Sequence, residues 1–410
     1  MVRKFRLLMF IQAFVFCGLF LCDNRGPQRD LFSRDTTTFF TDYYVPRSWL
    51  DSENCFKDAE NPCNYPPVGF AFLRPFPQGK EGAVVFMAVS SFLFLLCLTV
   101  FAKSAGMSWR SSVLTTASLV PSWIFVRTIE RGNTIFVAAA LICVFLTLFD
   151  CHSRWKRALA AISLGVAAAM KIAPAFIGCL YLVEPLENDG GRRRLDWLDM
   201  GICGLSAVVF FIGPFWILGN GFSDVLNWLG NAGDSSVGFP STWGLSGIYV
   251  HASGVLTNAL PSLTLAGCRA ATWIIGLILF ALFVVLCGLK KTMMRSDKMF
   301  FVVALMLILS PNSQFYMGII LFPALILWLH ETEITVEITA SRRTMDWLQM
   351  FLWLAMLTLV QIPVGGKPIT IFLTFASFYS LIAIKFCESS QRSNSAARDS
   401  QRQWARRAAT

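Results

Sequence analysis

The stretch Ala167-Ala168-Ala169-Met170-Lys171-Ile172-Ala173-Pro174 decides how this chain is arranged across a membrane. It joins the apolar segments 158–170 and 172–183, which would form one long helix if the chain did not break between them. Proline disrupts a helix interior because it lacks an N–H group and its ring clashes with the preceding turn. We therefore predict an outer turn at Lys171, which keeps the basic run Arg192-Arg193-Arg194 on the cytoplasmic side.

The composition around this stretch requires a membrane. Of 410 residues, 55% are hydrophobic and only 15% charged, whereas a soluble domain has about 25% charged residues. The apolar residues form runs of roughly 15 to 20, near the length that crosses about 30 Å of hydrocarbon. This pattern predicts an all-α polytopic membrane protein. It excludes a secreted enzyme, a nucleic-acid-binding module and a Rossmann-type soluble domain, so nucleic acid is not an expected partner.

Twelve apolar segments, several of them too short for a straight crossing, predict tilted or broken helices. Most Lys and Arg of the short connections fall on one side, which predicts that both termini are cytoplasmic. We interpret the first segment as an uncleaved anchor because it exceeds the apolar length of a signal peptide. The segments are 5–21, 82–102, 111–126, 133–149, 158–170, 172–183, 199–219, 271–289, 299–309, 315–329, 345–361 and 369–386.

The chain is predicted to form one transmembrane domain, residues 1–386, with two larger extracytoplasmic loops at 22–81 and 220–270. Residues 387–410 are rich in Ser, Arg and Gln. They have almost no large apolar side chains to bury, so we predict a disordered basic cytoplasmic tail.

Cys55 and Cys63 lie in the first outer loop, where an oxidising exterior would favour a disulfide. The alternative is two free thiols, because spacing alone fixes no connectivity. The three histidines have no partner at a metal-ligand spacing, so no zinc site is expected.

Asp42 is the candidate catalytic base. It stands in Phe39-Phe40-Thr41-Asp42-Tyr43-Tyr44, where flanking aromatic side chains would partly desolvate its carboxylate. The alternative is a solvated loop aspartate beside an interfacial aromatic belt.

A short outer turn is predicted to carry Arg127, Glu130, Arg131, Gly132 and Asn133. The unpaired amides of a helix beginning at Asn133 would attract an anion, and Lys171 is predicted on the same side. Cations converging on a helix start would form a phosphate site. The alternative, snorkelling to lipid phosphates, applies equally to Arg127 but less to Lys171, which lies in a proline-broken turn of small residues.

Two further outer elements are polar or rigid. Tyr65-Pro66-Pro67 sets the entry of the second helix and places Tyr65 at the headgroup level. Ser310-Pro311-Asn312-Ser313-Gln314 forms a polar outer turn between two short helices.

In this order, the motifs around Asp42, Tyr65-Pro66-Pro67, Arg131-Gly132-Asn133, Ala167–Lys171 and Ser310-Pro311 resemble glycosyltransferase family 87. Two elements depart from the family pattern. Ser313-Gln314-Phe315-Tyr316 replaces a Trp and a His pair, and Ser241-Thr242-Trp243-Gly244 replaces an Asn-Gln-Ser-Leu element.

The resemblance implies a GT-C-like bundle of about twelve helices and a hexosyltransferase, specifically an alpha-1,2-mannosyltransferase. The donor would be polyprenyl-phosphate mannose and the acceptor a glycan or glycolipid at the outer face of a bacterial inner membrane. Asp42 would be the catalytic aspartate and the reaction would invert the anomeric centre. Tyr65, Arg127, Arg131, Asn133, Lys171 and Asn312 are the expected substrate-binding residues. The sequence assigns no cofactor with certainty, and a divalent cation stays an open alternative.

Two other classes of protein remain open. Twelve segments with broken helices also suit a lipid-linked sugar transporter or flippase, although such folds usually have related halves and midplane binding residues. A GT-C-like ligase or polymerase would move a larger glycan from the same type of lipid carrier.

Overall fold

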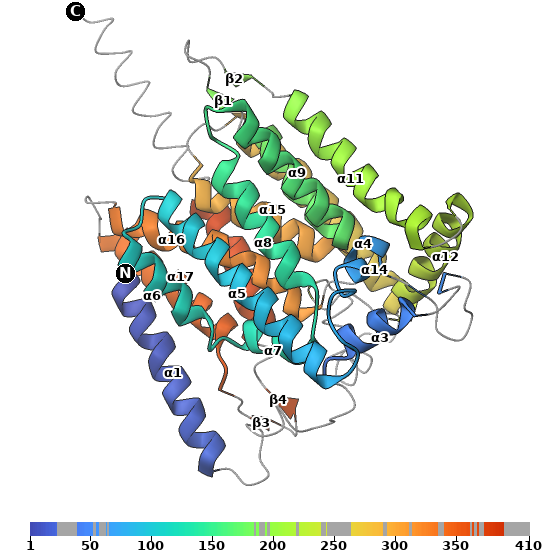
Figure 1. Cartoon of the computed structure of the whole chain (residues 1–410). Coiled ribbons are helices and arrows are strands. Elements are labelled where there is room, and N and C mark those ends of the chain that lie inside the picture. Colours follow the sequence, from blue (N-terminus) through green and yellow to red (C-terminus); the bar gives the residue numbers. More distant parts are fainter. Residues whose placement is uncertain are drawn as a thin grey trace, which may run out of the picture.

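A computed structural model gives the fold of this chain (Figure 1). The structure describes residues 1–22, 39–51, 55–56, 63, 65–183, 186–187, 193–194, 197–218, 221–238, 243, 264–289, 293–310, 314–334, 340–360, 363–364, 367–368 and 373–388. About half of the second outer loop and nearly all of the C-terminal tail lie outside these residues.

The described residues are mainly helical. Each of the twelve segments predicted from the sequence overlaps at least one helix. The helices are α1 (Val2–Cys22), α3 (Thr41–Trp49), α4 (Pro67–Ala71), α5 (Lys80–Ser104), α6 (Trp109–Leu119), α7 (Trp123–Arg131), α8 (Ile135–Leu148), α9 (Arg154–Lys171), α10 (Leu180–Val183), α11 (Trp197–Leu218), α12 (Phe222–Gly238), α14 (Leu265–Leu289), α15 (Arg295–Leu309), α16 (Phe322–Ile334), α17 (Ala340–Leu357), the 3-10 helices η1 (Ala173–Cys179) and η2 (Phe315–Leu321), and a helix at 373–388.

Two pairs of very short strands complete the described structure. β1 (Leu186–Glu187) pairs antiparallel with β2 (Arg193–Arg194), with Leu186 opposite Arg194. β3 (Pro363–Val364) pairs antiparallel with β4 (Lys367–Pro368).

Four of the described helical segments are long and apolar enough to cross a membrane: α1, α5, α11 and the continuous segment Phe315–Ile334. A fifth is obtained if α6 and α7 count as one bent span. The fold is thus that of an α-helical membrane protein, and length and composition identify fewer spans than the twelve predicted. α11 exposes large apolar side chains such as Ile217 and Leu205, as expected for a helix that faces lipid.

The helices pack as a bundle in which α9 lies between α8 and α11 (Figure 1). A methyl group at Gly165 of α9 would lie 2.6 Å from the carbonyl oxygen of Cys203 in α11. Small residues allow such close approach between membrane helices, where packing replaces the hydrophobic effect as the force of association. α15 and α16 lie deep in the bundle, since every residue of Met299–Leu309 and of Phe322–Leu329 is buried.

The segment 111–126 is not the single helix that its apolar run predicts. α6 ends at Leu119, α7 begins at Trp123, and the two helices are bent by 66°. Pro121 prevents continuation of α6, and the hydroxyl of Ser122 accepts a hydrogen bond from the Phe125 amide as the N-cap of α7. Consequently Arg127, Glu130 and Arg131 lie within helix α7 rather than in a turn.

The predicted break at Lys171 is confirmed. α9 ends at Lys171, and Pro174 lies in the first turn of the 3-10 helix η1 that follows. Between them Ile172 has φ = 56°, a left-handed conformation that is rare for a β-branched residue. The chain therefore changes direction at this point, as the sequence requires.

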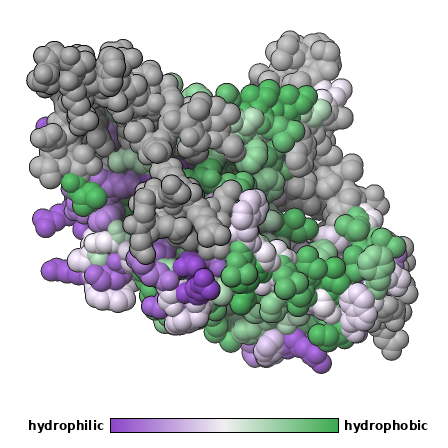
Figure 2. Space-filling view, turned by 90° about the horizontal axis from the view of Figure 1, so that it is seen from above, coloured by the Kyte–Doolittle hydropathy of each residue, from purple (hydrophilic) through white to green (hydrophobic). Residues whose placement is uncertain are grey.

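Ionic contacts gather at the end of the bundle where α9, α11 and α15 have one terminus each. Arg157 of α9 bonds Asp199 of α11 at 2.9 Å, and Lys385 bonds Asp297 of α15 at 2.6 Å with both side chains almost fully buried. Figure 2, viewed from above, shows hydrophilic side chains concentrated toward one side and hydrophobic ones over much of the remaining described surface.

Candidate active site

The start of α3 is attached to the end of α7, far along the chain. The Phe40 amide donates a hydrogen bond to the carbonyl oxygen of Glu130 at 2.8 Å. Gly132 ends α7 with φ = 69°, and a Cβ there would lie 3.0 Å from the Cα of Phe40. Glycine tolerates this conformation and leaves room for the neighbouring backbone. The attachment brings Asp42 beside Arg131, the last residue of α7.

Asp42 is held from both sides at this junction. Its Oδ1 accepts a hydrogen bond from Nη2 of Arg131 at 2.5 Å, and its Oδ2 accepts one from Nδ2 of Asn133 at 2.5 Å. The side chain of Asp42 is only 10% exposed, whereas that of Arg131 is 38% exposed. Since a carboxylate has about four lone-pair sites, each oxygen can still accept a further hydrogen bond. Asp42 is thus fixed in position while able to receive a proton.

Asn133 is oriented by the helix that follows it. The Ile135 amide donates to Oδ1 of Asn133 at 2.9 Å, which directs the Nδ2 amino group to Asp42 and to the hydroxyl oxygen of Tyr65 at 3.0 Å. The sequence predicts unpaired amides at the start of this helix. The structure differs, because the amide of Ile135, the first residue of the helix, is already hydrogen-bonded to the side chain of Asn133.

Lys171 lies over the aromatic ring of Tyr65. Its ammonium nitrogen is 3.9 Å from the centre of the Tyr65 ring, a cation–π contact. α4 makes this possible by a close approach to the end of α9, since a Cβ on Gly69 would lie 3.1 Å from the carbonyl oxygen of Met170. Tyr65 therefore contacts both Lys171 and Asn133, and Asn133 in turn bonds Asp42.

The electrostatics of the cluster follow from burial and from the two unlike charges. Burial lowers the pKa of Lys171 to about 8; the carboxylate of Asp42 opposes this shift and the guanidinium of Arg131 adds to it. Burial, together with the charge of Asp42, raises the pKa of Tyr65 well above its ordinary value. Tyr65 therefore keeps its proton, and the cluster combines two cations, one carboxylate and a phenol donor.

Tyr316 is the member of the cluster that sequence reasoning missed. Its hydroxyl lies within hydrogen-bonding reach of Tyr65 and Asn133 and close enough to Asp42 and Arg131 for electrostatic interaction. Trp243, fully buried, fixes this segment by donating from Nε1 to the carbonyl oxygen of Gln314 at 2.9 Å. The only signal in the sequence was that Phe315-Tyr316 stands where the resembling family has other residues.

The other two predicted binding residues are not part of this cluster as described. Arg127 forms an ion pair with Glu130 one turn along α7, and its guanidinium lies 4.6 Å from the ring centre of Trp123. Arg127 therefore faces a different environment from Arg131. Asn312 lies outside the described residues.

A wall of the site comes from both predicted outer loops. Trp228 of α12 donates from Nε1 to the carbonyl oxygen of Tyr65 at 2.8 Å, and Asn231 donates to the carbonyl oxygens of Phe56 and Cys63. Cys55 and Cys63 are buried thiols joined by a backbone hydrogen bond of 3.2 Å, with their side chains within hydrogen-bonding reach. The disulfide between them stays a prediction.

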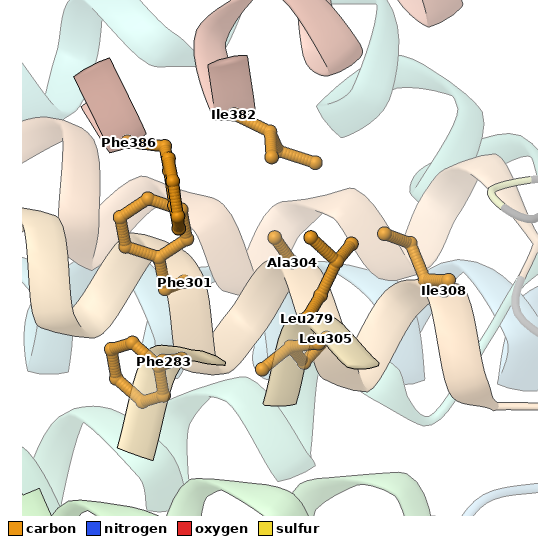
Figure 3. Close-up of a pocket in the computed structure, with 8 residues that line it drawn as sticks. All are labelled: Leu279, Phe283, Phe301, Ala304, Leu305, Ile308, Ile382 and Phe386. Carbon is orange, nitrogen blue, oxygen red and sulfur yellow. The ribbon is translucent and has the colours of Figure 1, made fainter. Parts of the chain in front are cut away.

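An apolar pocket lies away from the Asp42 cluster, between α14, α15 and the helix at 373–388 (Figure 3). It encloses about 340 Å³, counting the space at its open side, and its lining consists of Leu279, Phe283, Phe301, Ala304, Leu305, Ile308, Ile382 and Phe386. No side chain in this lining can transfer a proton. Within the described ranges, no group of three or more His, Cys, Asp or Glu side chains is placed to hold a metal ion.

Comparison with known proteins gives one match. The model of glycosyltransferase family 87 matches residues 64–311, more than half of the chain. This range includes Tyr65, Arg131, Asn133 and Lys171, while Asp42 and Tyr316 lie outside it. No curated protein and no solved structure matches the chain significantly.

Proposed function

Because this chain belongs to glycosyltransferase family 87, we propose that it moves a hexose, specifically mannose, from a polyprenyl-phosphate donor to an acceptor hydroxyl at the extracytoplasmic face. Membership in the family makes the chain a glycosyltransferase, and the donor, sugar and acceptor are the proposal. One observation supports it most strongly: a buried carboxylate, two cations and a protonated phenol converge where four distant parts of the chain meet.

Asp42 takes the proton of the acceptor in this proposal. The acceptor oxygen forms a bond to C1 of the sugar, and its hydrogen passes to a carboxylate oxygen of Asp42. Arg131 and Asn133 already fix that carboxylate by two hydrogen bonds, so little reorganisation accompanies the transfer.

The cations stabilise the leaving group. As the bond between C1 and the phosphate oxygen breaks, its electron pair goes to the phosphate of the polyprenyl carrier. Lys171, which lies over the Tyr65 ring, is the cation that we assign to that charge, and Tyr65 supplies an O–H donor. Arg131 bonds Asp42 through one nitrogen and has further N–H donors for the phosphate. A polyprenyl-phosphate donor brings its leaving group to the membrane face, so no nucleotide-binding fold is needed.

A carboxylate that acts as a base, with separate cations for the phosphate, supports a single displacement without a covalent intermediate. In such a step the acceptor attacks C1 opposite the departing phosphate, and the anomeric configuration is inverted. The product would be an alpha-1,2-linked mannoside of a glycan or glycolipid.

The same proposal includes an arrangement in the membrane. Residues 1–386 would form one domain of about twelve spanning or partly spanning helices, with both termini in the cytoplasm of a bacterial cell. The overlap of every predicted segment with a helix supports this arrangement. So does the position of α3, α4 and α12, the helices of the two outer loops, at one end of the molecule (Figure 1).

The experiment uses purified protein in nanodiscs with polyprenyl-phosphate mannose and a mannoside acceptor. We expect Asp42→Asn to reduce transfer by about 10²–10⁴-fold, since asparagine keeps the shape but cannot take a proton. Asp51→Asn is the matched control, because Asp51 is a more exposed carboxylate that pairs with Arg47 at the end of α3. Nuclear magnetic resonance of the product then gives its anomeric configuration.

Three outcomes would contradict the proposal. Near-normal transfer by Asp42→Asn would remove Asp42 as the base, and a retained configuration would exclude the single displacement. Movement of the lipid-linked sugar across the bilayer without any transfer would indicate a flippase. A screen of donors carrying longer glycans would identify a ligase or polymerase.

A further inference from the structure

α12 exposes large apolar side chains, which is unusual for a helix packed on a protein in water. Its exposed face carries Phe222, Leu226 and Leu229, which are 59%, 57% and 53% exposed. Residues at these spacings line one side of a helix, because an α-helix has 3.6 residues per turn. We call these three residues the outer stripe of α12.

The opposite face of α12 is packed against the protein and carries both polar and apolar residues, including Val225, which is 6% exposed. Asp224 and Trp228 are 1% and 3% exposed, and Asn231 contributes the hydrogen bonds to Phe56 and Cys63 described above. Exposure of the apolar side chains of α12 to water would be unfavourable in free energy, and the hydrogen bonds on its inner face do not offset that cost. The outer stripe therefore needs a cover.

The path of the chain indicates what covers it. α11, which ends at Leu218, is one of the helices able to cross a membrane, and its last turn exposes Trp216 and Ile217. α12 begins four residues later, after Gly221, whose φ of 83° permits a sharp turn. The exposed surface of a membrane-spanning helix is thus continuous with the outer stripe, and α12 starts where that helix leaves the hydrocarbon.

We propose that α12 lies in the plane of the outer leaflet, with Phe222, Leu226 and Leu229 inserted into the boundary between headgroups and acyl chains. Helices with a wholly apolar face bind at this depth. Leu226 and Leu229 meet the acyl chains, and Phe222 lies next to the end of α11. A lipid surface, not another protein, is the partner.

This docking has a consequence for the Asp42 cluster. Trp228, on the inner face of α12, holds the carbonyl oxygen of Tyr65, and Tyr65 contacts both Lys171 and Asn133. The depth of α12 in the leaflet therefore sets the height of the cluster relative to the lipid phosphates.

The experiment incorporates the photoreactive residue p-benzoylphenylalanine singly at positions 222, 226 and 229 of the full chain in phosphatidylcholine nanodiscs. Irradiation should attach phospholipid to the protein at each of the three positions, as measured by intact-protein mass spectrometry. Ser223 is the matched control, because it is exposed on the same helix but about 100° away from Phe222. We expect a lipid-adduct yield at least about fivefold higher at the outer stripe than at Ser223.

The readout is independent of turnover, so it can fail while the proposed transferase activity holds, and the reverse is also true. Because the three positions are exposed, the substitutions should leave the fold intact, and each position is read separately. A covalent dimer at the outer stripe would assign this face to a second copy of the chain and overturn the inference. Equal adduct yields at Ser223 and the outer stripe would overturn it as well.

Discussion

Lys171 is an unusual lysine because its ammonium group lies against an aromatic ring in a partly buried cluster that already contains a guanidinium. Burial is the main reason that the pKa of Lys171 falls from 10.5 to about 8. A lysine side chain in water keeps its charge up to a pH near 10.5. The charge that we assign to the donor phosphate is therefore lost within a range of pH accessible to an assay.

We predict that kcat/KM for the lipid-linked donor decreases as the pH rises through about 8, because this parameter reports the protonation state of the free enzyme. Stability should respond with the opposite sign. Between about 8 and 10.5 the unfolded chain binds the Lys171 proton and the folded protein does not, so the contribution of this group to the free energy of unfolding increases with pH. A pH series of initial rates and of denaturant unfolding measures both.

Variants at this position test the assignment. Lys171→Met should lower kcat/KM by about 10²–10³-fold below pH 8 and remove the alkaline decrease. Lys80→Met, at an exposed lysine that begins α5, should keep the wild-type pH profile. An alkaline decrease that survives in Lys171→Met would belong to another group.

Three of the predicted binding residues stand near chain-breaking signals, and the structure brings them into one cluster with Asp42 and Asn133. Arg131 precedes a glycine, Tyr65 precedes two prolines, and Lys171 stands three residues before a proline. Their role in binding stays a prediction. Tyr316 could not be predicted, because its position depends on the packing of η2 against α7, more than 180 residues away. The sequence groups Arg127 with Arg131 because they are close along the chain. In helix α7 they lie one turn apart, and Arg127 contacts Glu130 and Trp123 instead of Asp42.

The junction of α3 and α7 is the element on which the cluster depends. Gly132 ends α7 in a left-handed conformation and leaves room for Phe40 and Tyr43. Phe40 in turn donates its amide hydrogen to Glu130. These contacts hold α3 and α7 at a fixed distance. Asp42 lies on α3 and Arg131 lies on α7, about 90 residues apart in the chain.

We predict that Gly132→Ala separates these two elements. A Cβ at φ = 69° is strained, and it would approach the Cα of Phe40 to 3.0 Å, so we expect a loss of stability of about 1–3 kcal/mol and at least a tenfold loss of transfer. Thermal unfolding in detergent and initial rates measure the two effects. Gly201→Ala in α11, where a Cβ meets nothing within 4 Å, is the control and should change neither. Unchanged transfer in Gly132→Ala would show that the junction does not position Asp42.

Helix ends marked by a proline next to polar or small residues could be predicted from the sequence. Elements whose residues favour two different structures could not. Pro174 gave the end of α9, whereas Pro121, inside a long apolar run, was not recognised as the break between α6 and α7. The helix α12 was missed because the Gly, Ser and Asn content of its region is typical of a loop. Its apolar residues also point to both sides, since Trp228 packs inward while Leu226 and Leu229 point outward.

The whole molecule has polar contacts at both ends of an apolar bundle, and they differ in kind. At the end that carries Asp42, the side chains converge on one another and are partly exposed. At the other end they form separate pairs between helices, of which Lys385–Asp297 is the most deeply buried. The Lys385–Asp297 pair joins the helix at 373–388 to α15, and none of these pairs has a part in the proposed chemistry.

We predict that Lys385→Met destabilises the protein by about 3–5 kcal/mol, because it leaves the Asp297 carboxylate buried without its ammonium partner. The double variant Lys385→Met/Asp297→Asn should recover part of this loss, since neither charge then stays in the interior. Unfolding in detergent measures both, and transfer by the folded fraction should be unchanged. A double variant no more stable than Lys385→Met would contradict this explanation.

The two left-handed residues Phe40 and Ile172 lie immediately beside the segments that carry Asp42 and Lys171. Each such conformation costs a bulky residue about 1–2 kcal/mol, which the surrounding contacts must offset. When heating or harsh solubilisation weakens those contacts, these backbone positions relax first. The protein should therefore lose its catalytic competence at a lower temperature than its helical content, and circular dichroism alone would overestimate how much of a preparation is active.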